Sequence, residues 1–279
     1  MWLLLNLTRE PDGTLRTEPV KEIPKHDVDY LYSLFHFVGA YNVSKAAKDI
    51  AVRNGQSFKN FMRPDNLINY QNDFDNAILE ANRRCINYAV SLKSFIDITE
   101  RYLINDFESN AKQRYHDEIQ VPLFDSSFGY ALFSKLRNYV VHRSFPYSSG
   151  TVHTGGVEIR CSTERLLEWD NWTTIRNQIA QKAPFIPLEE YVDEASSILI
   201  AIWMQFISIF YGKEIENVIK QYSIYKKDNN VTGHIAFAEV DNREDIAKGF
   251  NMKPLPVNEL HECIKILQDN PRVTLNILD

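Results

Sequence analysis

Arg137 and His142 are the two side chains whose types and spacing point most directly to chemistry. They lie five positions apart, and Asn138 directly follows the arginine. A histidine near neutrality can take a proton from a ribose 2′-hydroxyl or give one to a leaving oxygen, and a guanidinium can hold a phosphate through paired hydrogen bonds. These residue types suit cleavage of RNA by internal transfer, a reaction that needs no metal.

The segment that carries these residues is predicted to be a helix buried on one face. Apolar residues recur in it every four positions: Phe128, Leu132, Leu136 and Val140. Polar side chains at 125–127 offer capping oxygens at its start. Phe145-Pro146 pushes the chain out of helical geometry, so we expect the helix to end close to His142.

The stretch Arg137-Asn138-Tyr139-Val140-Val141-His142 resembles the signature of the HEPN superfamily, an arginine and a polar residue followed by a histidine. HEPN proteins are helical bundles, and many of them are RNA-cutting toxins. The resemblance covers this one helix, and its flanking helices only in outline. It implies that Arg137, Asn138 and His142 are catalytic, and that two such motifs meet in a homodimer to form the active site.

Helix geometry leaves two arrangements open, and the resemblance supports the dimer. Residues five positions apart on a regular helix point about 140° away from each other, so one helix cannot focus Arg137 and His142 on one atom. Either the helix loosens near Ser144, or a second copy faces the first across a two-fold axis.

Neighbouring residues are expected to assist in RNA binding. Lys135 and Arg143 add local positive charge, and Tyr139 can stack on a base, although its place beside the apolar face favours core packing. His142 lies near the negative end of its helix, which favours the protonated ring and a general-acid role. Asn138 can orient the phosphate or the histidine.

A second interpretation stays open. Arg137 can pair with a carboxylate of a neighbouring helix while His142 donates a hydrogen bond to a loop, so that both only fix the bundle. The chain is then a non-catalytic HEPN-like module that binds a nucleotide, RNA or protein partner. In an enzyme, the two side chains should be exposed in a shared cleft.

Composition narrows the function classes. The net charge of -6 argues against general, charge-driven nucleic-acid binding, so any RNA contact must be local. Three widely spaced cysteines indicate neither a disulfide framework nor a zinc site, and we expect a reducing, cytoplasmic setting. Gly155-Gly156 lacks the context of a dinucleotide loop, and no phosphate-binding glycine loop is found. No cofactor and no metal are therefore expected.

Other polar clusters are interpreted as structural. The run His116-Asp117-Glu118 is expected to be a solvated charged face, because adjacent helical residues point apart. The acidic residues Glu189, Glu190, Asp193 and Glu194 are expected to stabilise the start of their own helix.

No membrane segment is expected. The apolar residues 1–7 have no basic segment before them and are interpreted as a strand. The run 198–210 is shorter than the roughly 20 residues that cross a bilayer and is interpreted as a buried helix.

The predicted fold class is mainly α: a HEPN-like helical bundle with a β-hairpin insertion and a small C-terminal α/β lobe. Residues 1–25 form an N-terminal hairpin, 26–225 the bundle, and 226–279 the lobe, whose sheet can include the hairpin. Helices are expected from 27 to 53, where Asn54-Gly55 ends the helix, and from 64 to 107 and 188 to 222. Pro122 is expected to end the segment before the motif helix.

The expected function is a metal-independent endoribonuclease with a role in toxin–antitoxin or antiviral defence systems. Its partners are then RNA, a second copy of the chain, and an antitoxin or regulatory protein.

Overall fold

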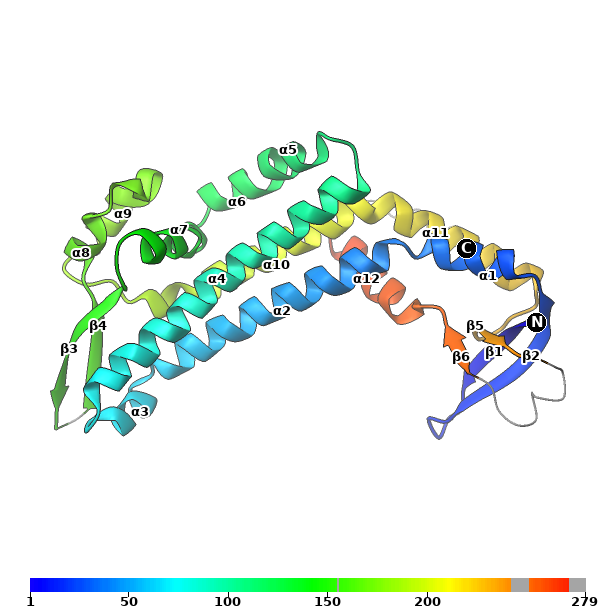
Figure 1. Ribbon diagram of the computed structural model, residues 1–279, viewed down its shortest axis with the longest axis horizontal. Coiled ribbons are helices and arrows are strands. Elements are labelled where there is room, and N and C mark those ends of the chain that lie inside the picture. Colours follow the sequence, from blue (N-terminus) through cyan, green and yellow to red (C-terminus); the bar gives the residue numbers. More distant parts are fainter. Residues whose placement is uncertain (155, 242–250, 271–279) are drawn as a thin grey trace. The chain divides into compact units, whose positions relative to one another are not determined.

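The computed structural model describes residues 1–154, 156–241 and 251–270 (Figure 1). Helix accounts for 67% of the structure and strand for 16%, which confirms the mainly α class expected from the sequence. The chain divides into two compact units, a sheet unit of residues 1–42 and 204–279 and a helical unit of residues 43–203. The expected borders follow residues 25 and 225. The observed borders lie elsewhere, inside the helices Phe37–Phe61 and Val192–Phe206.

The sheet unit is built on a four-stranded antiparallel sheet with the order β2-β1-β5-β6. Its strands are β1 (Trp2–Arg9), β2 (Leu15–Ile23), β5 (His234–Glu239) and β6 (Met252–Pro254). Alternating apolar residues bury one face of the sheet: Leu3, Leu5, Leu7, Ala236, Ala238 and Val240. The apolar start of the chain is thus a strand, as expected, and β5 pairs with it.

Helices complete the sheet unit. They are α1 (Lys25–Leu34), the π-helical turn η5 (Ile207–Tyr211), α11 (Gly212–Asp228) and α12 (Val257–Asp269). The Tyr222 hydroxyl of α11 accepts a hydrogen bond from the Ile235 backbone N–H at 3.2 Å, which ties a helix to the sheet. The strand-like residues 273–278 also predict a final strand for the lobe, and they lie outside the described residues.

The helical unit contains the motif and is formed by helices with one β-hairpin. Two of its helices, α2 (Phe37–Phe61) and α10 (Val192–Phe206), cross the borders between the units. The other elements are α3 (Pro64–Leu67), η1 (Ile68–Tyr70), α4 (Phe74–Asp106), α5 (Ala111–Tyr115), η2 (His116–Gln120), α6 (Val121–Asp125), α7 (Phe128–His142), β3 (Tyr147–His153), β4 (Gly156–Cys161), α8 (Thr163–Leu167), η3 (Asp170–Ile175), α9 (Arg176–Ala180) and η4 (Leu188–Tyr191).

Tyr88 on α4 is the point where the main helices of this unit meet. Its buried hydroxyl donates to the Val192 carbonyl oxygen at 3.1 Å and shares a hydrogen bond with Ser196 Oγ at 2.9 Å, both on α10. Its ring centroid lies 4.7 Å from that of Phe133 on α7. From α2, Gly55 leaves room for the ring, since a Cβ atom there would lie 2.8 Å from it. One tyrosine therefore joins α2, α4, α7 and α10.

Two expected helix ends are wrong. Asn54-Gly55 does not stop α2, which continues to Phe61, because the glycine serves close packing instead of termination. Pro122 does not end a helix either. It lies just after the π-helical turn η2, and the helical stretch 111–125 continues through it without a break. The expected helices 27–53 and 64–107 are instead interrupted by non-helical residues at 35–36 and 71–73.

The expected β-hairpin insertion is present as β3 and β4, which pair antiparallel. Asn82 of α4 anchors its first residue, because its side-chain amide donates to the Tyr147 carbonyl at 2.8 Å and accepts from the Tyr147 N–H at 3.0 Å. The Tyr147 hydroxyl then donates to Glu189 Oε2 at 3.2 Å. The hairpin is thereby held at its base, while much of β3 is exposed.

The apolar run near residue 200 belongs to a longer helical stretch than expected. Leu188–Asp228, which comprises η4, α10, η5 and α11, is helical over 41 residues and is apolar and long enough to cross a membrane. Of its apolar window, 61% is buried inside the protein, as in the core helix of a globular fold.

Gly55→Ala is expected to lower the free energy of unfolding by about 1–3 kcal/mol, because the added methyl group overpacks a ring whose hydroxyl is fixed by hydrogen bonds. Helix propensity alone predicts the opposite sign, a gain of about 1 kcal/mol. Gly39→Ala is the matched control, since Gly39 is an exposed position of the same helix and a Cβ atom there meets nothing within 4 Å. Urea unfolding of both variants distinguishes overpacking from helix propensity. Unchanged or higher stability of Gly55→Ala would contradict overpacking.

Glu189 is expected to make stability depend on pH. Burial raises the pKa of its carboxyl group above the ordinary value of 4.5. The folded chain then binds more protons than the unfolded chain above pH 4.5, so the free energy of unfolding falls as pH rises through the raised pKa. Glu189→Gln should flatten this fall in urea titrations across pH, whereas Glu190→Gln, at the exposed neighbouring position, should not. Parallel curves for the wild type and Glu189→Gln would exclude this origin.

Candidate functional site

The motif helix α7 begins on a cap supplied by two elements. Ser127 Oγ accepts from the Tyr130 N–H at 3.1 Å and donates to Glu194 Oε1 of α10 at 2.6 Å. Glu194 also accepts from the Gly129 N–H at 3.2 Å. Gly129 is required here, since a Cβ atom would lie 2.8 Å from the Tyr191 carbonyl oxygen. The start of α7 is therefore fixed against α10.

The acidic run before α10 does more than stabilise its own helix, so that expectation was incomplete. Glu194 caps α7, Glu189 accepts from the hairpin, and Asp193 forms an ion pair with Lys59 and accepts from Gln56 Nε2 at 3.0 Å. Sequence spacing could not show this, because the partners are more than forty residues away in the chain.

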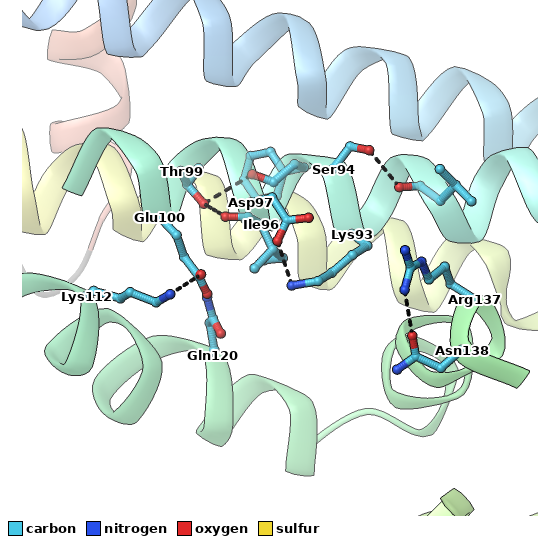
Figure 2. A network of polar contacts seen from close by, with 12 residues as sticks. Lys93, Ser94, Ile96, Asp97, Thr99, Glu100, Lys112, Gln120, Arg137 and Asn138 are labelled. Carbon is cyan, nitrogen blue, oxygen red and sulfur yellow. Dashed lines mark hydrogen bonds and ion pairs between the residues drawn. The ribbon is translucent and has the colours of Figure 1, made fainter. Parts of the chain in front are cut away.

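Arg137 and Asn138 are brought together near the end of α7. Arg137 Nη1 donates to Asn138 Oδ1 at 3.0 Å (Figure 2). Arg137 is partly buried and Asn138 is exposed. In the described part of the chain, Arg137 forms no ion pair with a carboxylate, and the amide nitrogen of Asn138 donates to no acceptor. Both therefore have free hydrogen-bonding capacity.

His142 is the last residue of α7 and is exposed. Its ring has no hydrogen-bond or ion-pair partner among residues 1–154, 156–241 and 251–270. The helix stays regular to this residue, so Arg137 and His142 point about 140° apart. Asn138 and His142, four positions apart, lie on the same face instead. The structure thus joins Arg137 to Asn138 and leaves His142 one turn further along.

Tyr139 is not available for base stacking, which corrects its expected place in RNA binding. Its side chain is fully buried, and its ring centroid lies 5.5 Å from that of Trp172 and 6.0 Å from that of Trp169. The hydroxyl donates to the Arg165 carbonyl at 3.4 Å, and burial raises its pKa. Its function is to pack α7 against the segment that follows the hairpin.

The two expected basic neighbours contribute less free charge than their types suggest. Arg143 is exposed and forms an ion pair with Glu168 at 3.1 Å. Lys135 Nζ donates to the Asn171 carbonyl at 3.4 Å and lies 5.9 Å from the centre of the Phe124 ring. Burial lowers the pKa of Lys135. Exposed ion pairs exchange readily, so Arg143 can still turn to a phosphate.

A pocket of about 400 Å³ opens beside Asn138. One wall is α4, a second is α7, and the third is the arm of residues 111–125, which comprises α5, η2 and α6. On α7 the pocket is lined by Tyr130, Ser134 and Asn138, which recur every four residues and so share one face. The row continues to His142, because that residue stands one further turn along.

A polar network holds the arm against α4 (Figure 2). Glu100 of α4 accepts from Lys112 at 2.9 Å and from Gln120 at 3.3 Å, both on the arm. Deeper in the protein, Thr99 Oγ1 and the Tyr115 hydroxyl share a hydrogen bond of 2.9 Å. These contacts give the pocket a defined third wall.

The pocket residues outside α7 were not found from the sequence. His116 was expected on a solvated face, and it is exposed with Nδ1 2.8 Å from Asp117 Oδ1, but it also lines the rim of the pocket with Lys93 of α4. The sequence signal for this wall was the charged segment 107–120, which lacks a regular helical pattern. Within the described ranges, no three His, Cys, Asp or Glu side chains form a metal site.

Comparison of the chain with protein-family models, curated proteins and solved structures finds no match. The arguments for the site therefore come from its own residues and geometry.

Proposed function

We propose that this chain is a HEPN-like, metal-independent endoribonuclease in which Arg137, Asn138 and His142 act on the phosphodiester. The observation that carries the proposal is the state of the two motif side chains. In the described part of the chain neither Arg137 nor His142 is neutralised by a carboxylate, and His142 is exposed. A pair that only fixed the bundle would be paired with a neighbouring helix.

The chemistry follows from the residue types. The 2′-hydroxyl gives its proton to water, and its oxygen attacks the adjacent phosphorus. The bond from phosphorus to the 5′-oxygen breaks, and the products are a 2′,3′-cyclic phosphate and a 5′-hydroxyl. Arg137 balances the charge that develops on the phosphoryl oxygens. His142, the last residue of α7, acts as the general acid and gives a proton to the 5′-oxygen. The Asn138 amide nitrogen donates to the phosphate.

A second copy of the chain is part of the proposal. One regular helix cannot aim Arg137 and His142 at one phosphate, so the arginine of one protomer acts with the histidine of the other. Apolar surface at the motif supports this contact. Val141 is 60% exposed and Phe145 is 56% exposed, on either side of His142. Exposed apolar side chains of this size favour burial in an interface.

The proposed partners are RNA, the second protomer, and an antitoxin or regulatory protein that restrains the activity in a toxin–antitoxin or antiviral defence system. The net charge of -6 makes RNA binding depend on local groups, so cleavage should be confined to sites that the motif surface fits.

Purified wild-type chain is expected to cut RNA in EDTA and to leave cyclic phosphate ends. His142→Ala and Arg137→Ala should each lower the rate by about 100-fold or more, because each removes a group that acts in the transition state. Product ends are identified by mass spectrometry, and folding is checked by circular dichroism.

Matched controls are His36→Ala and Arg101→Ala, two exposed positions outside the motif, and both should retain wild-type rates. If the folded wild type and all variants are equally inactive on varied RNAs, the nuclease proposal fails. Binding of RNA without cleavage, unchanged in His142→Ala, would favour the non-catalytic module.

Mixing the two inactive variants tests the shared site. Equal amounts of Arg137→Ala and His142→Ala, exchanged as subunits, should recover about a quarter of wild-type activity, because about half of the dimers are mixed and each has one complete site. A site within one chain predicts no recovery, since no chain then carries both groups. The dimer itself is measured by analytical ultracentrifugation, in which Val141→Asp should shift the chain towards monomer.

A further inference from the structure

The pocket beside Asn138 combines an apolar interior with polar groups at its rim. Ile96 of α4 and Phe124 of the arm supply apolar surface, and Phe124 stands edge-to-face with Tyr130 at a centroid distance of 6.4 Å. Lys93 and His116 supply polar atoms at the rim. This is the usual composition of a small-molecule site, and the volume lies in the usual range for one.

The charges around the pocket disfavour a phosphate inside it. Asp125 lines the pocket and is exposed, and Lys93 is already ion-paired with Asp97 at 2.7 Å. A phosphate inside would face the Asp125 carboxylate. At the Asn138 end, by contrast, the guanidinium of Arg137 is close, since it donates to the Asn138 side chain. An anionic group is therefore favoured at the motif and a neutral group in the pocket.

We propose that the pocket binds the base of a nucleotide whose phosphate lies at Arg137. This inference deepens the proposed function, because it assigns the residues that hold RNA beside the scissile bond. The occupant is a flat ring with hydrogen-bonding edges. Its face packs on Phe124 and Ile96, and its edge meets the acceptor Asp125 and one hydrogen of Asn138 Nδ2, whose second hydrogen points to the phosphate.

The geometry of α7 supports this occupant over a simple apolar ligand. Asn138 brings an amide nitrogen with no acceptor in the described part of the chain to the same wall as Tyr130, and an acyl chain would leave this donor without a partner. The same row of side chains leads to His142 one turn beyond. A nucleotide with its base among these residues therefore extends its sugar and phosphate towards the motif.

Calorimetric titration of the full chain with AMP, CMP, GMP and UMP tests the inference. At least one nucleotide should bind, and ribose 5-phosphate, which lacks the base, should bind at least about tenfold more weakly. Val121→Trp should weaken nucleotide binding by about tenfold, because Val121 lines the pocket, is 38% exposed and tolerates a larger side chain that fills the space.

Leu79→Trp is the matched control, since Leu79 is 63% exposed on α4 and lies outside the pocket lining, and it should bind as the wild type does. Ser134→Phe fills the same pocket from α7 and repeats the test if Val121→Trp does not fold. Three outcomes would each overturn the inference. They are the same affinity for ribose 5-phosphate as for the nucleotides, no binding of any nucleotide, and wild-type nucleotide affinity in the folded pocket variants.

Failure of this inference is distinguishable from failure of the proposed function. If RNA is cut and needs His142 while Val121→Trp binds nucleotides and cuts at wild-type levels, the pocket proposal is wrong and the nuclease proposal stands. If nucleotides bind and Val121→Trp abolishes binding while no RNA is cut, the pocket proposal stands without the nuclease.

Discussion

A buried tyrosine hydroxyl must keep its hydrogen bonds, and in the helical unit this requirement fixes where α4, α7 and α10 meet. Tyr88 satisfies it with Val192 and Ser196, and its ring then has one place in which to pack against Phe133. The position of α7 follows from that contact and from its cap on Glu194. The first half of α7 is therefore held by its cap and by this ring contact, and the second half by Tyr139 against Trp169 and Trp172.

Local pattern predicted the motif helix closely, because its apolar repeat and the proline after it act within a few residues. The end of this helix was expected near His142, and α7 ends at that residue. Gly55 was misjudged for the opposite reason: its use depends on a ring brought by another helix. The pocket walls were beyond prediction, since Lys93, His116 and Asn138 come from three segments whose meeting depends on tertiary packing.

The electrostatic pattern shows how an acidic chain can present a local cation. Several carboxylates are occupied by neighbours within the fold, as Glu194 is by the start of α7 and Asp193 is by Lys59. Near the motif, Glu168 neutralises Arg143, whereas Arg137 donates to a neutral amide and to no carboxylate among the described residues. A guanidinium on a neutral partner exerts its full charge on an incoming anion. The position of that charge, more than the net charge, decides where a polyanion can bind.

The arm that forms the third wall of the pocket is fastened to α4 at two depths, by a buried hydrogen bond to Thr99 and by outer contacts to Glu100. It is joined to α4 through residues 107–110 and to α7 through Ser126-Ser127, and neither connection belongs to a long helix. Its contacts to Glu100 are at the surface, where salt weakens them. Ionic strength therefore acts on the outer contact of the arm, whereas the buried hydrogen bond between Thr99 and Tyr115 holds the wall in place at any salt concentration.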